Sequence, residues 1–390
     1  MSKYARSIFI FRRDFRLQDN TALLAALRKS EVVIPVFIMT PEQLVDNPYK
    51  SSNCVQFMFE SLAELDQQIQ KVSSGRLFYF FGETIEVLSE LLERTRAEAV
   101  FYNMDYTPYS TDRDEKIAEL CSSRDVESHQ YEDLLLQPVG SLVTGSGSIY
   151  TKFTPFFNKA KHVPVKKPVA NSYNNYWEKK IRGEYRGDRS EFYELNDSIL
   201  VHGGRKAALA ILNRIESQAN YNRTRNNLPG HTSQLSAYIK FGCVSIREVY
   251  HAFLTKLGEK NDLIKQLYWR EFYYNISHAF PHIYFKRGAM REKYDQIEWN
   301  PPGKLFRRWK EGRTGFPIVD ACMRQMNTTG YMHNRGRLIV SNFLVKIMGI
   351  SWKEGERYFA TQLVDYDPAN NNGGWQWGAG SGADSQQYNR

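Results

Sequence analysis

Short apolar runs that alternate with amphipathic stretches constrain the first third of this chain more than any other feature. The runs are SIFIF (7–11), VVIPVFIM (32–39), LFYFF (77–81) and AVFYN (99–103). Between them lie stretches such as NCVQFMFESLAELDQQIQ (53–70), in which apolar residues recur at helical spacing. Buried strands joined by crossover helices form a parallel sheet, so we predict an α/β domain with a parallel, Rossmann-like sheet. No GxGxxG or GxxxxGK[ST] sequence follows these runs, which excludes the usual phosphate-binding signatures.

Two further regions follow the predicted sheet. The first is rich in Gly, Ser, Pro, Lys and Asn, as is typical of a connection between domains. The second has helical spacing, for example in RKAALAILNRIESQ (205–218) and RGRLIVSNFLVKIM (335–348). A chain of 390 residues is long enough for two domains. We therefore predict an α/β domain over 1–135, a linker over 136–195 and an all-helical domain over 196–390.

Charge is divided unevenly along the chain. Up to Asp133 there are 15 Lys and Arg against 22 Asp and Glu, and beyond it 37 against 21, which gives net charges of −7 and +16 within the total of +9. A positive excess is typical of a domain that binds nucleic acid, because binding releases counterions from the polyanion. A merely solvated basic surface would give the same balance.

The sequence lacks the marks of a membrane or secreted protein. No run of about 18 apolar residues is present, and the start MSKYARSIFIFRRDF has neither the apolar core nor the cleavage site of a signal peptide. We expect an intracellular monomer, in the cytoplasm or nucleus or made by a virus in an infected cell. The four cysteines are far apart and form no CxxC pair, so we expect reduced thiols and no metal site.

The stretch NNGGWQWGAG (371–380) combines amides, glycines and two tryptophans, which are poor material for a helix or a strand. One tryptophan, Trp177, lies in the predicted linker, and the other six lie in the predicted helical domain: Trp269, Trp299, Trp309, Trp352, Trp375 and Trp377. Core packing explains most tryptophans in proteins. Here, however, Arg, Asn and Asp interleave with aromatic residues in otherwise apolar helices. Polar groups in an apolar shell must be paired, and a large polar ligand would pair them.

Several of these segments resemble consecutive motifs of the DNA photolyase and cryptochrome family. FIFRRDFRLQDN (9–20) is similar to the family's first strand and loop, YTKFTPF (150–156) to its linker signature, and HTSQLSAYIKFGCVS (231–245) to its flavin phosphate segment. Further along, in the family's order, come WREFYY (269–274), TGFPIVDACMRQ (314–325), YMHNRGR (331–337) and DYDPANNNGGWQW (365–377). The resemblance runs over nearly the whole chain.

The resemblance implies an all-α domain that binds FAD and an α/β domain that can hold an antenna chromophore, for which a folate, a deazaflavin or none are all compatible with the sequence. The positions that match flavin contacts are Tyr221, Thr232, Ser233, Gln234, Leu235, Ser236, Trp269, Asn334, Arg337, Asp365, Asp367 and Asn371. Arg337 and Asp365 are expected to pair beside the isoalloxazine. Asn371 matches the position facing flavin N5, where one amide can donate or accept. Without the resemblance, an Asn in a Gly-rich corner is typical of a turn.

The resemblance also implies an electron path and a pocket for damaged bases. Trp375 resembles the flavin-proximal member of a tryptophan chain, Trp352 the middle member and Trp299 the surface-side member. Trp377 matches the ring against which a flipped pyrimidine dimer packs. The other positions implied for DNA are Arg225, Glu271, Tyr274, Asn334, Arg335 and Leu338, with the two arginines on phosphates. For Arg225 taken alone, a solvated helix residue is the alternative.

Within the family, the residues favour light-dependent repair of cyclobutane pyrimidine dimers in UV-damaged DNA, driven by electron transfer from photoexcited reduced FAD, as in class I photolyases. Asn334 stands where the (6-4) branch has His, and plant cryptochromes usually lack the equivalent of Trp377. A cryptochrome-like flavin photoreceptor without repair activity is the alternative.

Three features depart from the class I pattern. Tyr274 stands where Trp is common, and Leu338 where Met is frequent. The sequence stops at ADSQQYNR (383–390), whereas the family continues for several helices, and its last residue, Arg390, matches a DNA-facing Arg. Either a separate polypeptide supplies those helices or this is a shortened form.

Overall fold

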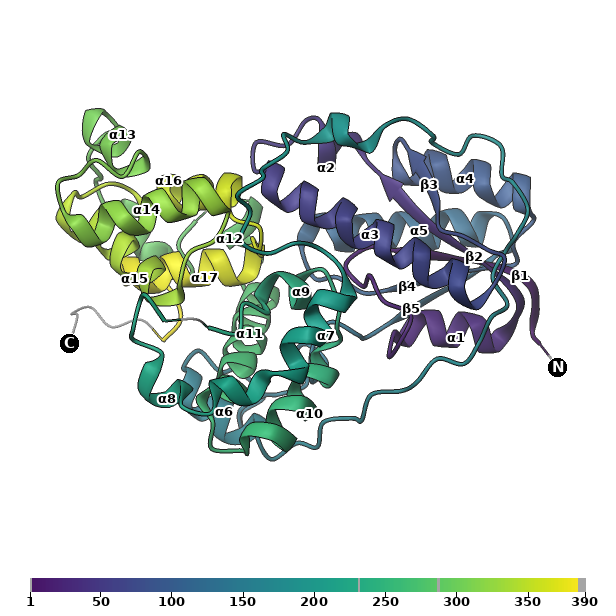
Figure 1. Cartoon of the computed structure of the whole chain (residues 1–390), viewed down its shortest axis with the longest axis horizontal. Coiled ribbons are helices and arrows are strands. Elements are labelled where there is room, and N and C mark those ends of the chain that lie inside the picture. The colour runs from purple at the N-terminus through teal and green to yellow at the C-terminus, as the bar shows by residue number, and fades with distance from the viewer. Residues whose placement is uncertain (1, 231, 286–287, 385–390) are drawn as a thin grey trace.

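The chain folds into a parallel sheet flanked by helices, followed by a larger group of helices (Figure 1). The computed structural model describes residues 2–230, 232–285 and 288–384. The strands are β1 (Tyr4–Phe11), β2 (Ser30–Met39), β3 (Phe78–Phe81), β4 (Ala99–Asn103) and β5 (Glu127–Tyr131). They pair in parallel in the order β3-β2-β1-β4-β5. The predicted parallel sheet is confirmed, and each of the four apolar runs contributes a strand.

The strand that the apolar pattern does not predict is β5. Its sequence, ESHQY, is polar, and its side chains are exposed or half-buried. It pairs with β4 alone and so forms an edge of the sheet. An edge strand needs no continuous apolar run, and polar side chains there discourage pairing with other chains.

Helices cover both faces of the sheet. They are α1 (Thr21–Lys29), α2 (Pro41–Leu44), α3 (Ser52–Val72), α4 (Thr84–Thr95) and α5 (Pro108–Ser123). Phe9 and Phe11 of β1 lie in one apolar core with residues of α1 and α3, whereas Ile8 and Ile10 lie in a second core with residues of α4 and α5. Alternate residues of a strand point to opposite faces, so β1 serves both cores. In this doubly wound arrangement, the residues that follow β1 and β4 lie together at the carboxyl ends of the parallel strands.

The rest of the chain is helical in its regular structure, although its residues 161–188 form neither a helix nor a strand. Its α-helices are α6 (Phe153–Ala160), α7 (Arg205–Asn213), α8 (Tyr221–Thr224), α9 (Ser236–Lys240), α10 (Ile246–Leu257), α11 (Asp262–Ala279), α12 (His282–Phe285), α13 (Lys304–Lys310), α14 (Pro317–Thr329), α15 (Asn334–Asn342), α16 (Trp352–Gln362) and α17 (Pro368–Ala379). Short 3-10 turns are η1 (Arg189–Phe192), η2 (Ile215–Gln218) and η3 (Glu292–Gln296), and η4 (Phe343–Ile347) is a π-turn. In the part of the chain that the structure describes, no helix combines the length and hydrophobicity needed to cross a bilayer.

The prediction that NNGGWQWGAG makes a poor helix is wrong, because most of it lies in α17. Asp367 caps the first turn by accepting a hydrogen bond from the Asn370 amide, and Pro368 occupies the first helical position. Packing explains one of the glycines, since a Cβ at Gly373 would lie 2.2 Å from the ring of Tyr273 on α11. Tertiary contacts therefore override the weak local preference for a helix.

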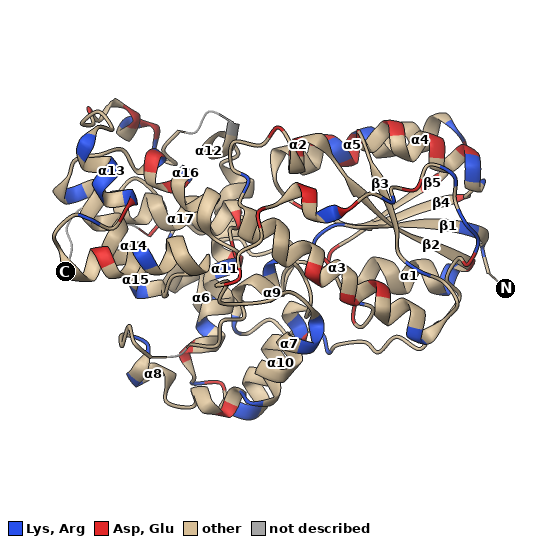
Figure 2. Cartoon of the chain, turned by 45° about the horizontal axis from the view of Figure 1, so that its top comes forward, with Lys and Arg blue, Asp and Glu red and all other residues tan. Residues whose placement is uncertain are grey.

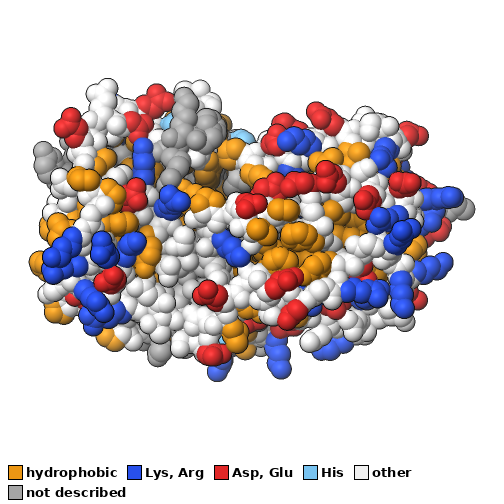
Figure 3. Space-filling model, turned by 90° about the horizontal axis from the view of Figure 1, so that it is seen from above, with side chains coloured by type: hydrophobic (Ala, Val, Ile, Leu, Met, Phe, Trp, Pro, Cys, Tyr) orange, Lys and Arg blue, Asp and Glu red, His pale blue; other side chains and the backbone are white. Residues whose placement is uncertain are grey.

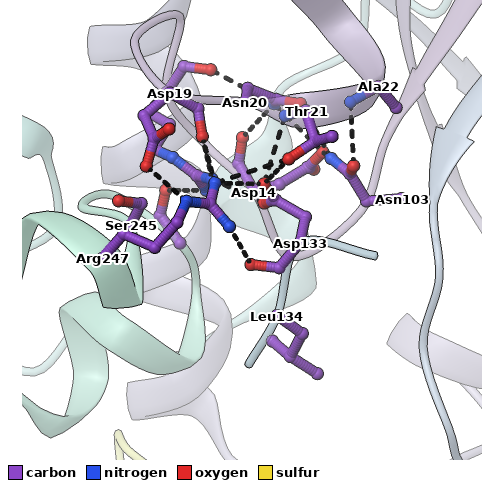
Figure 4. A network of polar contacts seen from close by, with 12 residues as sticks. Asp14, Asp19, Asn20, Thr21, Ala22, Asn103, Asp133, Leu134, Ser245 and Arg247 are labelled. Carbon is purple, nitrogen blue, oxygen red and sulfur yellow. Dashed lines mark hydrogen bonds and ion pairs between the residues drawn. The ribbon is translucent and has the colours of Figure 1, made fainter. Parts of the chain in front are cut away.

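A buried network of charges joins the α/β part to the helical part (Figure 4). The Asp133 carboxylate accepts hydrogen bonds from Arg16 at 2.5 Å, Thr21 at 2.7 Å and Arg247 of α10 at 2.8 Å. Arg247 also pairs with Asp19 at 2.9 Å. Burial acts to raise the pKa of Asp133, but Arg16 and Arg247 lower it to about 2. We call this network the Asp133 junction.

Charge differs between the two parts of the molecule. Acidic residues recur on α3 and α4, and basic residues recur on α13 (Figure 2). Lys304, Arg307 and Arg308 of α13 are exposed. Seen from above, basic side chains gather at the end of the molecule where α13 lies, and others lie among acidic side chains at the opposite end (Figure 3). The positive excess beyond Asp133 is therefore partly concentrated in one region of the helical part.

Candidate functional site

The residues predicted to contact flavin lie on two neighbouring groups of helices. Tyr221, the segment 232–236 and Trp269 belong to α8, the start of α9 and α11. Arg337 and the segment 365–371 belong to α15 and the start of α17. Helix α11 packs against both α8 and α17, and α15 also packs against α17 (Figure 1). The fold therefore brings together residues that are far apart in the sequence.

Arg337 and Asp365 form the ion pair that the resemblance implies. Nη2 of Arg337 donates to both carboxylate oxygens of Asp365, at 3.0 and 2.9 Å, and Nε donates to the Met332 carbonyl at 2.9 Å. Burial acts to lower the pKa of Arg337, but the Asp365 charge raises it above its ordinary value. The guanidinium is thus held charged and oriented inside the helical part.

Tyr331 links this ion pair to the segment 232–236. Burial and the Asp365 charge raise the pKa of Tyr331, while the Arg337 charge and hydrogen bonds with the Ser236 and Thr232 side chains act in the opposite direction. Within the segment, Gln234 has a φ of +54°, which is unusual for a residue other than glycine. Strained backbone of this kind is concentrated at ligand sites.

Asp367 is turned toward the α/β part. One carboxylate oxygen caps α17, and the other accepts hydrogen bonds from Nη2 of Arg13 at 2.6 Å and from Oη of Tyr274 at 2.5 Å. Burial acts to raise the pKa of Asp367, but Arg13 and other neighbours hold it well below its ordinary value. The side chain is therefore ionised and fully used by protein groups.

Three other predicted flavin contacts differ in exposure. Asn371 is half-buried, and its amide donates to the Glu356 carbonyl at 3.1 Å and carboxylate at 3.0 Å, which ties α17 to α16. Trp269 is half-buried and stacks on Phe153 of the YTKFTPF motif, with ring centroids 3.6 Å apart and planes 5° apart. Asn334 is exposed at the start of α15.

The predicted tryptophan chain lies in one apolar cluster. Trp375 and Trp352 are buried in it, and Trp299 packs against its edge with a half-buried side chain. Trp375 and Trp352 are each 3% exposed, and the predicted surface-side member, Trp299, is the most exposed of the three. Trp309, for which no role is predicted, is fully buried in the same cluster, and its ring centroid lies 6.1 Å from that of Trp375.

Some of the residues predicted to contact DNA are accessible to solvent, and others are buried. Asn334 is exposed, and four further side chains are half-buried: Arg225, Arg335, Leu338 and Trp377. Arg225 forms an ion pair with Asp262 at 2.8 Å. Glu271 and Tyr274 are each only 2% exposed. Arg390 lies outside the described residues.

Glu271 and Tyr274 join the helical part to the α/β part and linker instead of facing an open surface. The Glu271 carboxylate accepts hydrogen bonds from the backbone amides of Leu136 at 3.0 Å and Gln137 at 3.3 Å. Burial raises the pKa of Glu271 to about 7. Oη of Tyr274 lies between Arg13 and Asp367. This arrangement differs from the base-contacting positions that the sequence predicts for both side chains.

The donor set suits FAD. Guanidinium and hydroxyl groups bind phosphate and ribose oxygens, and the residues predicted to contact flavin offer both: Tyr221, Thr232, Ser233, Ser236 and Arg337. Nε2 of His333 is buried without a hydrogen-bond partner among the described residues. Burial and the charges of Arg335 and Arg337 lower the pKa of His333. Such an unsatisfied ring nitrogen is consistent with a polar ligand at this place.

Four structural features of the site are absent from the sequence predictions. Arg13, Phe153 and Tyr331 all lie inside the motifs that carry the family resemblance, so motif membership was the available signal. Trp309 carries no such signal, because a buried tryptophan is ordinarily a core residue.

The family-model comparison matches both parts of the chain. The model described as DNA photolyase matches residues 7–172, and the model described as FAD binding domain of DNA photolyase matches residues 263–390. A curated relative, the deoxyribodipyrimidine photo-lyase of a Synechococcus strain, is 34% identical over 97% of this chain and 81% of its own length.

Solved structures give the same result. An archaeal photolyase from Sulfolobus tokodaii, described with two FAD molecules and a novel light-harvesting cofactor, has a TM-score of 0.88 and 41% identity and covers 99% of this chain and 85% of its own. The Synechocystis cryptochrome has a TM-score of 0.88 and 26% identity and covers 100% of this chain and 85% of its own.

Proposed function

The chain belongs to the DNA photolyase family and has its FAD-binding domain, and from this premise we propose that it repairs cyclobutane pyrimidine dimers in UV-damaged DNA with light. The single observation that carries this proposal is the tryptophan cluster. Trp352 and Trp375 are buried in it, half-buried Trp299 packs against it, and Trp377 follows Trp375 by two residues on the same helix. Electron supply and lesion binding can thus meet at α17.

The flavin site is proposed to be built from both helix groups. Tyr221 and the segment 232–236 hold the phosphates and ribose, and the Arg337–Asp365 pair lies beside the rings. When bound, FAD in its reduced form supplies a light-driven one-electron donor. Asn371 presents its amide oxygen to the ring edge, where it can accept a hydrogen bond, while Glu356 holds its NH2 group.

The tryptophans are proposed to carry electrons inward. On excitation of a bound oxidised flavin, Trp375 would give up one electron, Trp352 would refill Trp375 and Trp299 would refill Trp352, and a reductant in solution would restore the oxidised Trp299. Their burial keeps water away from the inner two rings. A side chain acting as general acid or base is not needed for ring splitting by electron transfer.

The lesion is proposed to bind between α15 and α17. Trp377 packs against the flipped dimer, whose unstacking costs less than that of intact bases. Asn334 supplies an amide, Leu338 an apolar contact, and Arg225 and Arg335 bind phosphates. We leave Glu271 and Tyr274 out of the lesion pocket, because their side chains are buried against other parts of the protein.

A flavin photoreceptor without repair activity is the second candidate. The match of the Synechocystis cryptochrome to the entire chain favours it. The presence of Trp377 favours repair over sensing.

The test is illumination of the purified protein with an oligonucleotide containing a thymine dimer, under reducing conditions. Recovery of intact thymines is expected, with a dark sample as the control. Photoreduction of the flavin without loss of dimers would contradict repair and support the photoreceptor.

The antenna and partners complete the proposal. Because the archaeal photolyase is described with two FAD molecules, a second FAD joins folate and deazaflavin as a candidate antenna chromophore. The absorption spectrum of the native protein distinguishes these three chromophores.

An intracellular location is retained because the substrate is DNA. The comparisons give no support to a separate polypeptide that supplies further helices, and we do not propose one.

A further inference from the structure

We infer that Arg13, a residue of the α/β part, is a positioning residue for the flavin site. It fixes the first turn of α17 through Asp367 and the body of α11 through Tyr274. The inference rests on FAD binding and not on the lesion that the protein repairs.

The Arg13 guanidinium touches four elements of the fold. Nη2 donates to Asp367 at 2.6 Å and to Tyr274 at 2.9 Å, Nη1 donates to Asp105 at 3.2 Å, and Nε donates to the Lys240 carbonyl at 3.3 Å. The side chain is only 17% exposed. Two carboxylates, one from each part of the protein, therefore share one buried cation. Arg13 is the second residue after β1, so the end of the strand fixes its backbone position.

Asp367 couples the position of Arg13 to α17, the helix that carries the flavin-facing residues. Its two carboxylate oxygens have different tasks, since one caps α17 through Asn370 and the other faces Arg13. Asn371 and Trp375 follow four and eight residues later, about one and two turns along α17. A displacement of the capped end therefore moves both side chains relative to α11 and α15.

This contact is separate from the Asp133 junction. Arg247 and Arg16 hold α10 to the α/β part through Asp133 and involve neither α11 nor α17. Loss of Arg13 therefore leaves a second buried junction between the two parts. The expected effect is local, on the helices around the flavin.

Arg12 is the matched control. It is the neighbouring residue, its side chain is 9% exposed, and it pairs with Asp114 at 2.8 Å. Both partners lie in the α/β part, and this ion pair is at least as buried as those of Arg13 without reaching the flavin helices. A comparison of Arg13→Gln with Arg12→Gln separates positioning of the flavin site from a general loss of buried charge pairing.

The experiment measures FAD release from the full-length, FAD-loaded protein well below its unfolding temperature, by the fluorescence of the released flavin. Arg13→Gln is expected to release FAD about tenfold faster than the parent, equivalent to roughly 1.4 kcal/mol of binding. Arg12→Gln is expected to release it at the parent's rate, and Arg13→Lys to restore part of the difference. The absorption bands of bound flavin should change in Arg13→Gln only.

Equal release rates in the two Gln variants, or an unchanged rate in Arg13→Gln, would overturn the inference. If Arg13→Gln does not fold, Asp367→Asn takes its place, because Asn still caps the helix but no longer offers Arg13 a carboxylate. A parent protein that binds FAD but repairs no dimer would contradict the proposed function and leave this inference intact. A parent protein that binds no FAD would overturn both.

Discussion

Gly355 of α16 lies against the Trp375 ring of α17 with no room for a side chain between them. A Cβ at position 355 would lie 2.1 Å from Cη2 of Trp375 and 2.7 Å from a methyl carbon of Leu344. Both distances are far shorter than a van der Waals contact. The glycine therefore sets how closely α16 approaches the tryptophan that we place next to the flavin.

Gly355→Ala is expected to destabilise the protein by about 1–3 kcal/mol, because the core must shift to admit the methyl group. The measurement is thermal unfolding of the purified variant. Gly374→Ala is the matched control, since nothing lies within 4 Å of a Cβ at that position of α17. The control should be neutral or more stable by up to about 1 kcal/mol, because Ala favours a helix. Equal losses in both variants would show that steric contact with Trp375 is not the cause.

Trp352→Phe is expected to slow photoreduction of oxidised FAD at least about tenfold, because Phe is a much poorer one-electron donor than Trp. Repair by chemically reduced enzyme should be largely unchanged. Trp309→Phe provides the comparison, since Trp309 is buried in the same cluster but lies outside the proposed path. Similar slowing in both variants would mean that electrons also pass through Trp309, whose ring lies near Trp375.

Trp377→Ala is expected to weaken binding of dimer-containing DNA by about 1–3 kcal/mol, the usual contribution of a base stacked on an aromatic ring. Binding of undamaged DNA should change much less. Affinities for the two duplexes are measured at one salt concentration, because phosphate contacts depend on salt. A uniform loss for both duplexes would remove Trp377 from the lesion pocket.

Glu271 is expected to make stability depend on pH. Its pKa in the folded protein is raised by burial from the ordinary 4.5 to about 7, so the folded state binds more protons than the unfolded state between these values. Its contribution is complete below about pH 4.5 and is lost as the pH rises through 7, by up to about 3 kcal/mol. Glu271→Gln should remove this dependence. Urea unfolding at pH 5 and pH 8 measures it, and parallel pH profiles for parent and variant would contradict the raised pKa.

The fold was predictable where burial requires a recognisable pattern of apolar residues in the sequence. Strands buried on both faces must be apolar throughout, which is why β1 to β4 were recognisable. The edge strand β5 is polar because it pairs with β4 alone, and Gly373 of α17 is required by its close contact with Tyr273 of α11. Strand β5 carries no apolar run, and the glycines and amides of α17 outweigh the helix-start signal of Asp367 and Pro368, so neither element was predicted.

The candidate site depended on resemblance more than on periodicity. The pairing of Arg337 with Asp365 was implied by motif positions, and the structure shows it. The contact between Arg13 and Asp367 joins residues 354 positions apart, and no local pattern encodes such a pair. The burial of Glu271 was also beyond local sequence, because its amide partners come from the linker.

The Asp133 junction also bears on how the two parts find each other while the chain folds. Before docking, Asp19, Asp133 and Arg247 are hydrated, so the junction adds little net attraction once its desolvation is counted. If the two parts docked at a wrong angle that covered these groups, a charged side chain would be buried in an apolar contact without its counter-ion. Such a burial would cost several kcal/mol of docking free energy. The network therefore makes misaligned docking of the two parts unfavourable more than it stabilises the correct docking.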